Sequence, residues 1–217
     1  MKHRTSPAAV ALAATAAVLL TACGGGSDNS KNDAKTAVSK PKSETSASPR
    51  AKTSSSTDRP AITFPSDAKN VFDDRKTDDK TKAAILADSA LSINAVDEAI
   101  FKGSTGTKAL GFYNTGKALN SSITYVQGYI DDADTWIGET RYFDRRVTLS
   151  GADKAYVTYC SDESKSFIKN KKTHKVDRTP TTANSYVLYH TVLNRSAEGT
   201  WQTTDIVSNR GDKACQP

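Results

Sequence analysis

Hydrophobic and polar positions divide the chain into four successive parts. An uncharged apolar run, Ala8–Leu20, is followed by a long polar stretch, a segment with helical spacing, and a series of short strand-like runs. The apolar run has thirteen residues and follows Lys2 and Arg4, whereas a membrane-spanning helix needs about 20 residues. It therefore has the length and flanks of the hydrophobic part of a secretion signal peptide.

The polar stretch runs from Gly24 to Pro60 and consists almost entirely of Ser, Thr, Lys, Ala, Asp, Asn, Gly and Pro. With so few large apolar side chains, it cannot bury enough surface to offset the conformational entropy lost on ordering. We expect a disordered spacer. We assign residues 1–22 to the signal peptide, 23–66 to the linker and 67–217 to a folded domain.

Helical spacing is strongest between Thr77 and Lys102, where apolar residues recur at intervals of three and four. Thr77 or Asp78 is the expected N-cap, and Gly103 is the expected end. A second, shorter helix is predicted at Lys108–Leu119. The apolar positions of the first helix are Ala83, Ala84, Ala87, Ala90, Leu91, Val96, Ala99 and Ile100.

After Asn120 the pattern changes to short runs rich in β-branched and aromatic residues, separated by turn residues. Helices followed by hairpins are typical of an α+β domain, in which N-terminal helices pack on one face of a curved antiparallel sheet. The predicted strands are Ser122–Ile130, Trp136–Leu149, Lys154–Tyr159, Ser166–Val176, Ser185–Asn194 and Thr200–Val207.

Residues 20–23 read Leu-Thr-Ala-Cys and are followed by three glycines. This resembles the lipobox of bacterial lipoproteins. The resemblance implies that Cys23 receives a diacylglyceryl group, becomes the mature N-terminus and anchors the protein to the extracytoplasmic face of the cell membrane. Two acyl chains satisfy the two-signal condition for stable anchoring. The alternative is an ordinary secretion signal that is cleaved after Ala22 and leaves Cys23 free.

The two remaining cysteines, Cys160 and Cys215, would then lie in an oxidising compartment where a disulfide persists. The bridge would close a loop of 55 residues and stabilise the fold by about 4 kcal/mol in the chain-entropy model. Two buried thiols are the alternative. Cys215 lies two residues from the C-terminus, where a cross-link is useful and a core position is unusual.

Charge falls unevenly along the chain. The 30 basic and 24 acidic residues give a net charge of +6, but residues 67–217 hold 21 basic and 20 acidic residues, a charge of +1. The basic excess therefore belongs to the signal and the linker. This distribution, with the extracytoplasmic location, argues against nucleic acid as a partner. The low hydrophobic share of 36% is explained in the same way by the spacer.

Four segments form a recognisable series: residues 109–119, the strands around Gly128 and Gly138, residues 157–162, and a closing strand from residue 198 that ends near Cys215. Together they resemble the nuclear transport factor 2-like family, and more narrowly its lipid-anchored actinobacterial members. The resemblance implies a cone fold that encloses a pocket. Some members of this family use the pocket for isomerase or dehydratase chemistry and others only for binding.

By this resemblance, the candidate pocket residues are Tyr113, Tyr125, Trp136, Tyr142 and Asp162. No catalytic, metal-binding or cofactor-binding motif occurs. We therefore favour a binding or accessory module of the cell envelope, whose partner is an unidentified small ligand or envelope protein. The alternative is a small isomerase or lyase that uses Asp162 or Asp134 with Tyr113 or Tyr125. Asp162 also suits a turn residue that bonds its own backbone.

One dense cationic run extends from residue 169 to residue 178. It could contact an anionic envelope surface, or it could be the solvated tip of a hairpin. Its cations are Lys169, Lys171, Lys172, Lys175 and Arg178. Two other short motifs carry no function here. Residues 111–117 match a phosphate loop but lack the following Ser or Thr, and the triplet at 210–212 is interpreted as a polar turn.

Overall fold

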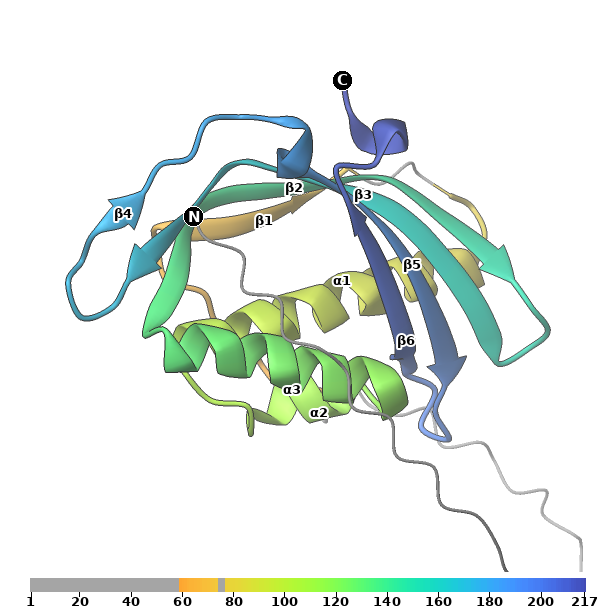
Figure 1. Cartoon of the computed structure of the whole chain (residues 1–217). Coiled ribbons are helices and arrows are strands. Elements are labelled where there is room, and N and C mark those ends of the chain that lie inside the picture. Colours follow the sequence, from red (N-terminus) through yellow and green to blue (C-terminus); the bar gives the residue numbers. More distant parts are fainter. Residues whose placement is uncertain (1–58, 74–76) are drawn as a thin grey trace, which may run out of the picture. The chain divides into compact units, whose positions relative to one another are not determined.

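The computed structural model describes residues 59–73 and 77–217 (Figure 1). The proposed signal peptide, Cys23 and the linker up to residue 58 lie outside the described residues. Two short 3-10 turns also occur: Ala183–Ser185 comes directly before the strand that starts at Tyr186, and Lys213–Cys215 follows the last strand. The main elements are β1 (Ala68–Phe72), α1 (Lys80–Lys102), α2 (Lys108–Tyr113), α3 (Gly116–Asp131), β2 (Asp134–Leu149), β3 (Lys154–Asn170), β4 (Val176–Asp177), β5 (Tyr186–Arg195) and β6 (Trp201–Arg210).

The six strands form one curved sheet in the order β1-β2-β3-β5-β6, with β4 paired to β3. All pairs are antiparallel except β1 with β2, which is parallel. The mixed α+β class with a curved sheet is therefore confirmed. The sheet was expected to be antiparallel throughout, and the parallel pair at its β1 edge corrects that expectation. Two register shifts in β2, between Glu139 and Arg141 and between Phe143 and Arg146, bend the strand.

Helix α1 begins one residue later than the sequence predicted. Asp79 is its N-cap and accepts hydrogen bonds from the backbone N–H groups of Thr81 and Lys82. Its end is confirmed at Gly103, which adopts a left-handed conformation with φ of 62°. The charged residues of α1 are not all on its solvent side, because Asp88 and Glu98 are buried.

The region 108–131 differs most from the prediction. Helix α2 ends at Tyr113, because Asn114 is extended and its buried side chain contacts Ser92. A new helix, α3, then covers the segment that was predicted to be the strand Ser122–Ile130. That prediction was wrong: Ser122 and Val126 are buried at helical spacing, while the neighbouring β-branched residues lie on the exposed side.

Strand predictions after residue 131 were closer, with one error of extent, and one strand near the N-terminal end of the described chain was missed. The two predicted strands Lys154–Tyr159 and Ser166–Val176 are largely one long strand, β3, followed by a turn and β4. Residues 160–165, which lie between the two predicted strands, continue the strand. Strand β1 was not predicted, since it lies within a short segment where alternation is weak.

The segment 59–66, which we name the strap, packs on α1 instead of belonging to the linker. Arg59 pairs with the buried carboxylate of Asp88, which also accepts the backbone N–H of Trp201 at 2.9 Å. Thr63 donates its backbone N–H to Glu98 at 2.9 Å. The expected boundary at residue 67 is therefore corrected, and packed structure extends to Arg59.

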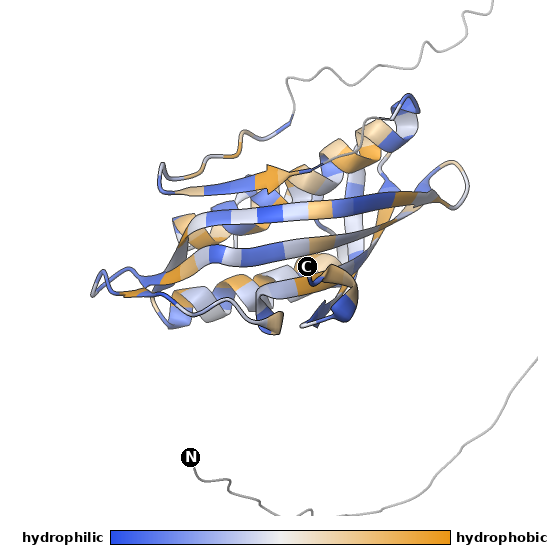
Figure 2. Cartoon of the chain, turned by 90° about the horizontal axis from the view of Figure 1, so that it is seen from above, coloured by the Kyte–Doolittle hydropathy of each residue, from blue (hydrophilic) through white to orange (hydrophobic). Residues whose placement is uncertain are grey.

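Hydrophilic and hydrophobic positions alternate along the strands (Figure 2). Of three apolar clusters among the described residues, one lies between α1 and α2 around Tyr113. The other two lie between the helices and the sheet. One joins the first half of α1 to β3, β5 and β6 around Leu193 and Trp201. The other joins the end of α1 to α3 and β2 around Ile100 and Trp136. The predicted disulfide is confirmed: Cys160 of β3 is bonded to Cys215, with 5.5 Å between their Cα atoms.

Candidate functional site

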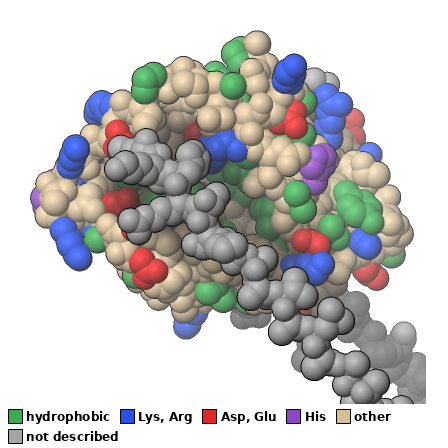
Figure 3. Space-filling model, in the orientation of Figure 1, with side chains coloured by type: hydrophobic (Ala, Val, Ile, Leu, Met, Phe, Trp, Pro, Cys, Tyr) green, Lys and Arg blue, Asp and Glu red, His purple; other side chains and the backbone are tan. Residues whose placement is uncertain are grey.

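A cavity of about 650 Å³ lies between α1, α3 and the concave face of the sheet. Figure 3 shows the molecule hollowed on this face, with hydrophobic side chains inside the hollow. The volume is within the range of small-molecule sites. Six aromatic side chains line the cavity: Tyr125, Tyr129, Trp136, Tyr142, Tyr159 and Tyr189.

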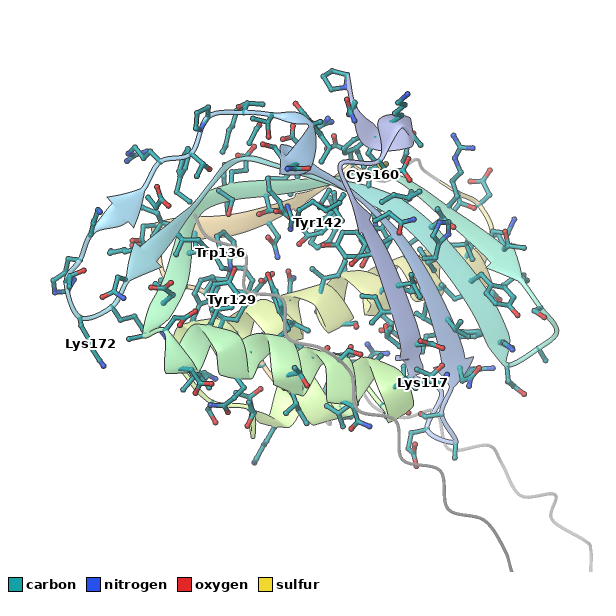
Figure 4. The ribbon with its side chains drawn as sticks, viewed as in Figure 1. Lys117, Tyr129, Trp136, Tyr142, Cys160 and Lys172 are labelled. Atoms are coloured by element: carbon teal, nitrogen blue, oxygen red, sulfur yellow. A yellow bond between two sulfur atoms is a disulfide. The ribbon has the colours of Figure 1, made fainter. Side chains whose placement is uncertain are left out.

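The elements present these side chains because of their periodicity. On α3, Ser122, Tyr125 and Tyr129 are three and four residues apart and therefore share one helical face. On the sheet, Trp136 and Tyr142 of β2 and Tyr159 of β3 point inward. Figure 4 shows Tyr129, Trp136 and Tyr142 directed into the space between helices and sheet.

The sheet tyrosines are held rigidly by ring contacts. Tyr159 stacks on Tyr189 with ring centroids 4.9 Å apart, and Tyr142 meets Tyr159 edge-on at 6.0 Å. Burial raises the pKa of Tyr142, Tyr159 and Tyr189 above the ordinary value, so their phenols keep their protons at physiological pH. These hydroxyl groups are therefore neutral donors or acceptors in fixed positions.

The carboxyl group of Asp97, on α1, faces the same cavity. Its Oδ1 accepts a hydrogen bond from the indole Nε1 of Trp136 at 3.1 Å, and its Oδ2 accepts one from Asn70 Nδ2 at 2.6 Å. Burial raises the pKa of Asp97 to about 7, although these two hydrogen bonds oppose the shift. Asp97 can therefore hold or release a proton near neutral pH.

A second polar cluster belongs to the sheet side of the wall. Arg210 of β6 makes two contacts with the carboxylate of Glu163 on β3, at 2.7 and 3.3 Å. Arg210 also donates to the backbone carbonyl of Asn184 at 2.8 Å, and Ser161 donates to Glu163 at 3.3 Å. This ion pair closes the wall where the loop before β5 meets the end of β6.

Three of the five candidate pocket residues line this cavity: Tyr125, Trp136 and Tyr142. The other two do not. Tyr113 is buried behind α1, with the guanidinium group of Arg59 6.0 Å from its ring centroid. Asp162 lies in β3, where its side chain accepts the backbone N–H of Ser164 at 2.9 Å, as expected for a residue that bonds its own backbone.

Asp134, the other acid of the enzyme alternative, is also remote from the cavity. Its side chain accepts a hydrogen bond from Asn170 Nδ2 at 2.9 Å, at the base of the turn between β3 and β4. The structure therefore does not bring the predicted acids and tyrosines together. The acid that faces Trp136 and the tyrosines is Asp97.

Asp97, Glu163 and Arg210 were not among the predicted site residues. A signal existed for Asp97, because it follows Ile93 by four residues and so shares the helical face that points inward. Glu163 lies in the interval between two predicted strands, next to Asp162, which suited a turn residue. Arg210 was assigned to a terminal polar turn, whereas it is the last residue of β6.

The cationic run is partly used inside the fold. Lys169 pairs with Asp67 at 3.2 Å, and Lys171 donates to the backbone carbonyls of Ile100 and Phe101 at the end of α1. Of the other three cations, Arg178 lies over the ring of Phe167, and Lys172 and Lys175 are exposed. Figure 4 shows Lys172 pointing away from the body of the domain at the tip of the turn.

Metal binding has no support in the described part of the chain, where His, Cys, Asp and Glu side chains form no group of three suited to a metal ion. Among the same residues, no helix has both the length and the apolar character needed to cross a membrane.

Comparison with known proteins gives matches to solved structures only. No family model matches the chain. No curated protein matches it either. A ketosteroid isomerase-like protein from Erwinia carotovora atroseptica has 16% identity and a TM-score of 0.41, and the match covers 61% of this chain and 97% of that one.

Two further solved structures are similar at the same level. A domain of unknown function with a cystatin-like fold from Nostoc punctiforme has 16% identity and a TM-score of 0.37, with 62% of this chain and 79% of that one covered. The intermembrane space region of the chloroplast protein ARC6 has 12% identity and a TM-score of 0.36, with 63% and 99% covered. Identities and TM-scores at this level support no statement about the activity or the ligand of this protein.

Proposed function

We propose that this protein is an extracytoplasmic binding or accessory module, anchored by a lipid on Cys23, whose cavity holds a small organic ligand. The observation that supports this most directly is the cavity of about 650 Å³ lined by six aromatic side chains. Fixed rings with a few hydrogen-bonding groups among them are the usual composition of a small-molecule site. The signal and lipobox patterns support the location.

The hydrogen bonds within the wall favour binding over turnover. Both oxygens of Asp97 already accept a hydrogen bond, from Trp136 and Asn70, and Glu163 is paired with Arg210. Groups held in this way keep a fixed shape and a fixed pattern of donors and acceptors. Such preorganisation lowers the entropic cost of capturing a ligand.

Native mass spectrometry of the chain from residue 23 onward, isolated from its own envelope, tests the binding proposal. We expect a small molecule to co-purify. Ser122→Trp, which fills the cavity from α3, should abolish it. Thr124→Trp, on the exposed side of the same helix, should keep it. A mass identical to that of the bare chain in all three proteins would contradict the proposal.

Analysis of the N-terminal peptide tests the anchor. We expect the mature chain to begin at Cys23 and to carry the added mass of a diacylglyceryl group. Replacing Cys23 by Ser should remove this mass and release the protein to the medium. An unmodified Cys23 in a chain retained by the membrane would contradict the lipid anchor while leaving the cavity proposal intact.

One observation favours a second candidate function, a small isomerase or lyase. Asp97 faces the cavity with a pKa of about 7, which suits a group that takes a proton from carbon and returns it. The enzyme alternative thus keeps Tyr125 but replaces Asp162 and Asp134 by Asp97. The bicyclic ketone 2-tetralone in D₂O provides a test, with deuterium uptake at the carbons next to its carbonyl group followed by NMR.

The enzyme candidate predicts that the wild-type protein accelerates this exchange and that Asp97→Asn does not. Asp162→Asn, which lies outside the cavity, should retain the wild-type rate. Exchange at the rate of buffer alone would remove the enzyme candidate and leave the binding proposal standing.

A further inference from the structure

The charges of the cavity wall are unbalanced. Four charged side chains line it: Asp97, Glu163, Asp177 and Arg210. The only cation among them, Arg210, is engaged by Glu163 through two contacts at 2.7 and 3.3 Å. Within the described lining, this leaves the carboxyl groups of Asp97 and Asp177 without a basic partner.

This acidity is a property of the cavity and not of the domain. Residues 67–217 carry a net charge of +1, and several exposed lysines lie on the outside of the fold. Above pH 7, where Asp97 is ionised, an excess of two carboxylates in a nearly neutral domain gives the cavity a local negative potential, which attracts cations and repels anions.

The aromatic side chains of the wall also favour a cation. The face of a phenol or indole ring carries partial negative charge and attracts a cation within about 6 Å of its centroid. Tyr125 and Tyr129 stand on α3 with rings edge-to-face, 5.2 Å between centroids, and their hydroxyl oxygens are 3.2 Å apart. Tyr125 is 53% exposed, so its ring is available to a ligand.

The indole and guanidinium donors of the wall are committed within the fold. The indole N–H of Trp136 donates to Asp97, and Arg210 donates to Glu163 and to the carbonyl of Asn184. An anionic head group would therefore meet carboxyl groups without a free basic side chain in the described lining. A protonated amine would meet carboxylates and ring faces.

We propose that the cavity selects an organic cation, a protonated or quaternary amine with an apolar body. This inference rests on the proposed binding function, since it names the chemical class of ligand for the same cavity. The ammonium group would lie near Asp97 and Asp177, and the apolar body would pack against the tyrosine rings.

Three probes with the same body and different head groups test the inference: 4-phenylbutylamine, 4-phenylbutan-1-ol and 4-phenylbutyrate. Their affinities are measured by calorimetry at pH 8, above the pKa of Asp97, on the chain from residue 23 onward with Cys23→Ser. Heteronuclear NMR reports whether the amides around Thr140 and Tyr159 shift. We expect the amine to bind about tenfold more tightly than the carboxylate, with the alcohol between them.

Two variants assign the preference to the named acids. Asp177→Asn and the double variant Asp97→Asn/Asp177→Asn should each reduce the ratio of amine affinity to alcohol affinity. Asp177 is exposed, so its replacement keeps the test valid if Asp97→Asn impairs folding. The matched control is Asp153→Asn, in the exposed turn between β2 and β3, which should leave the ratio unchanged.

The outcomes separate the two proposals. Equal affinity for the three probes, or tighter binding of the carboxylate, would overturn the cation preference and leave a cavity that binds ligands. If none of the probes shifts the cavity amides and no molecule co-purifies with the protein, both the preference and the binding function are overturned.

Discussion

Asp97 is a single side chain that ties the cavity to the core. Its carboxyl group fixes the indole of Trp136, which also packs against Phe64 and Phe101. On its other side it bonds Asn70, whose Nδ2 also contacts Asn94 at 2.9 Å. A change in the protonation of Asp97 therefore alters hydrogen bonds that join α1 to β1 and β2.

This residue makes the stability of the fold depend on pH. Asp97 has a pKa of about 7 in the fold, mainly because of burial, against 3.8 as the ordinary value. Between these values the folded chain retains a proton that the unfolded chain has released. The free energy of unfolding should therefore fall as pH rises from 4 to 7, and this contribution should be constant above that range.

Asp97→Asn should lack this dependence, because its amide is neutral at every pH. Urea unfolding at pH 4.5, 6 and 8 should show the variant gaining stability relative to the wild type as pH rises. Asn70 Oδ1, which has no partner among the described residues, offers an acceptor to the new amide. Parallel pH profiles for the two proteins would contradict the shifted pKa.

The same residue shows why the site was only partly predictable. Tyr125, Trp136 and Tyr142 were found because large aromatic residues in a predicted cone are natural lining candidates. In the sequence, Asp97 stands between the apolar positions Val96 and Ala99 of the predicted helix, a place typical of a solvent-facing charge. The four-residue spacing from Ile93 places Asp97 on the same helical face, but only the packing of α1 against the sheet turns that face toward the cavity.

At the scale of elements, the bend of β2 depends on Gly138. Its φ is 99°, and a Cβ atom at this position would lie 2.1 Å from the backbone carbonyl oxygen of Lys165 on β3. Gly138→Ala should lower the free energy of unfolding by more than about 3 kcal/mol, since both the backbone and the neighbouring strand must shift.

Gly151→Ala provides the matched control. Its φ of 86° is equally unfavourable for alanine, but nothing lies within 4 Å of the added atom. We expect a loss of about 1 kcal/mol from backbone strain alone. If chemical denaturation gave equal losses for the two variants, the close approach of β3 to Gly138 would not be the cause.

The turn after β3 supports the end of α1 through Lys171. Its ammonium group donates to the carbonyl of Ile100 at 2.6 Å, where a helix has unpaired acceptors and a partial negative charge. Lys171→Met should cost about 1 kcal/mol in urea unfolding. The exposed neighbour Lys172, changed to Met, should stay within about 0.5 kcal/mol of the wild type; equal effects would rule out this supporting role.

Elements were predicted well where one face is apolar and the ends carry cap or turn residues, as in α1 and β5. They were mispredicted where local composition and burial disagree. Helix α3 contains Ile123, Thr124 and Val126, all typical of strands, and only Val126 is buried. Strand β3 contains a polar run that is typical of a turn, but Glu163 and Ser166 within it face the polar part of the cavity wall.

At the scale of the whole domain, the disulfide joins the middle of the sheet to the C-terminus. Cys160 and Cys215 are 97% and 99% buried, and they close a loop of 55 residues. The double variant Cys160→Ala/Cys215→Ala should lose about 4 kcal/mol of unfolding free energy. Reduction of the wild type with dithiothreitol during urea unfolding should produce a similar loss, and an unchanged midpoint would contradict the stabilising role.

The strap gives the domain a defined point of mechanical attachment. Asp88 contacts both Arg59 and the first residue of β6, so three separate stretches of the chain meet at one carboxylate. With Cys23 held in a membrane as proposed, tension along the chain would enter at Arg59 and load this ion pair and the Thr63–Glu98 bond first. A pulling force would then peel the strap from α1 before it reached the hydrogen bonds of the sheet.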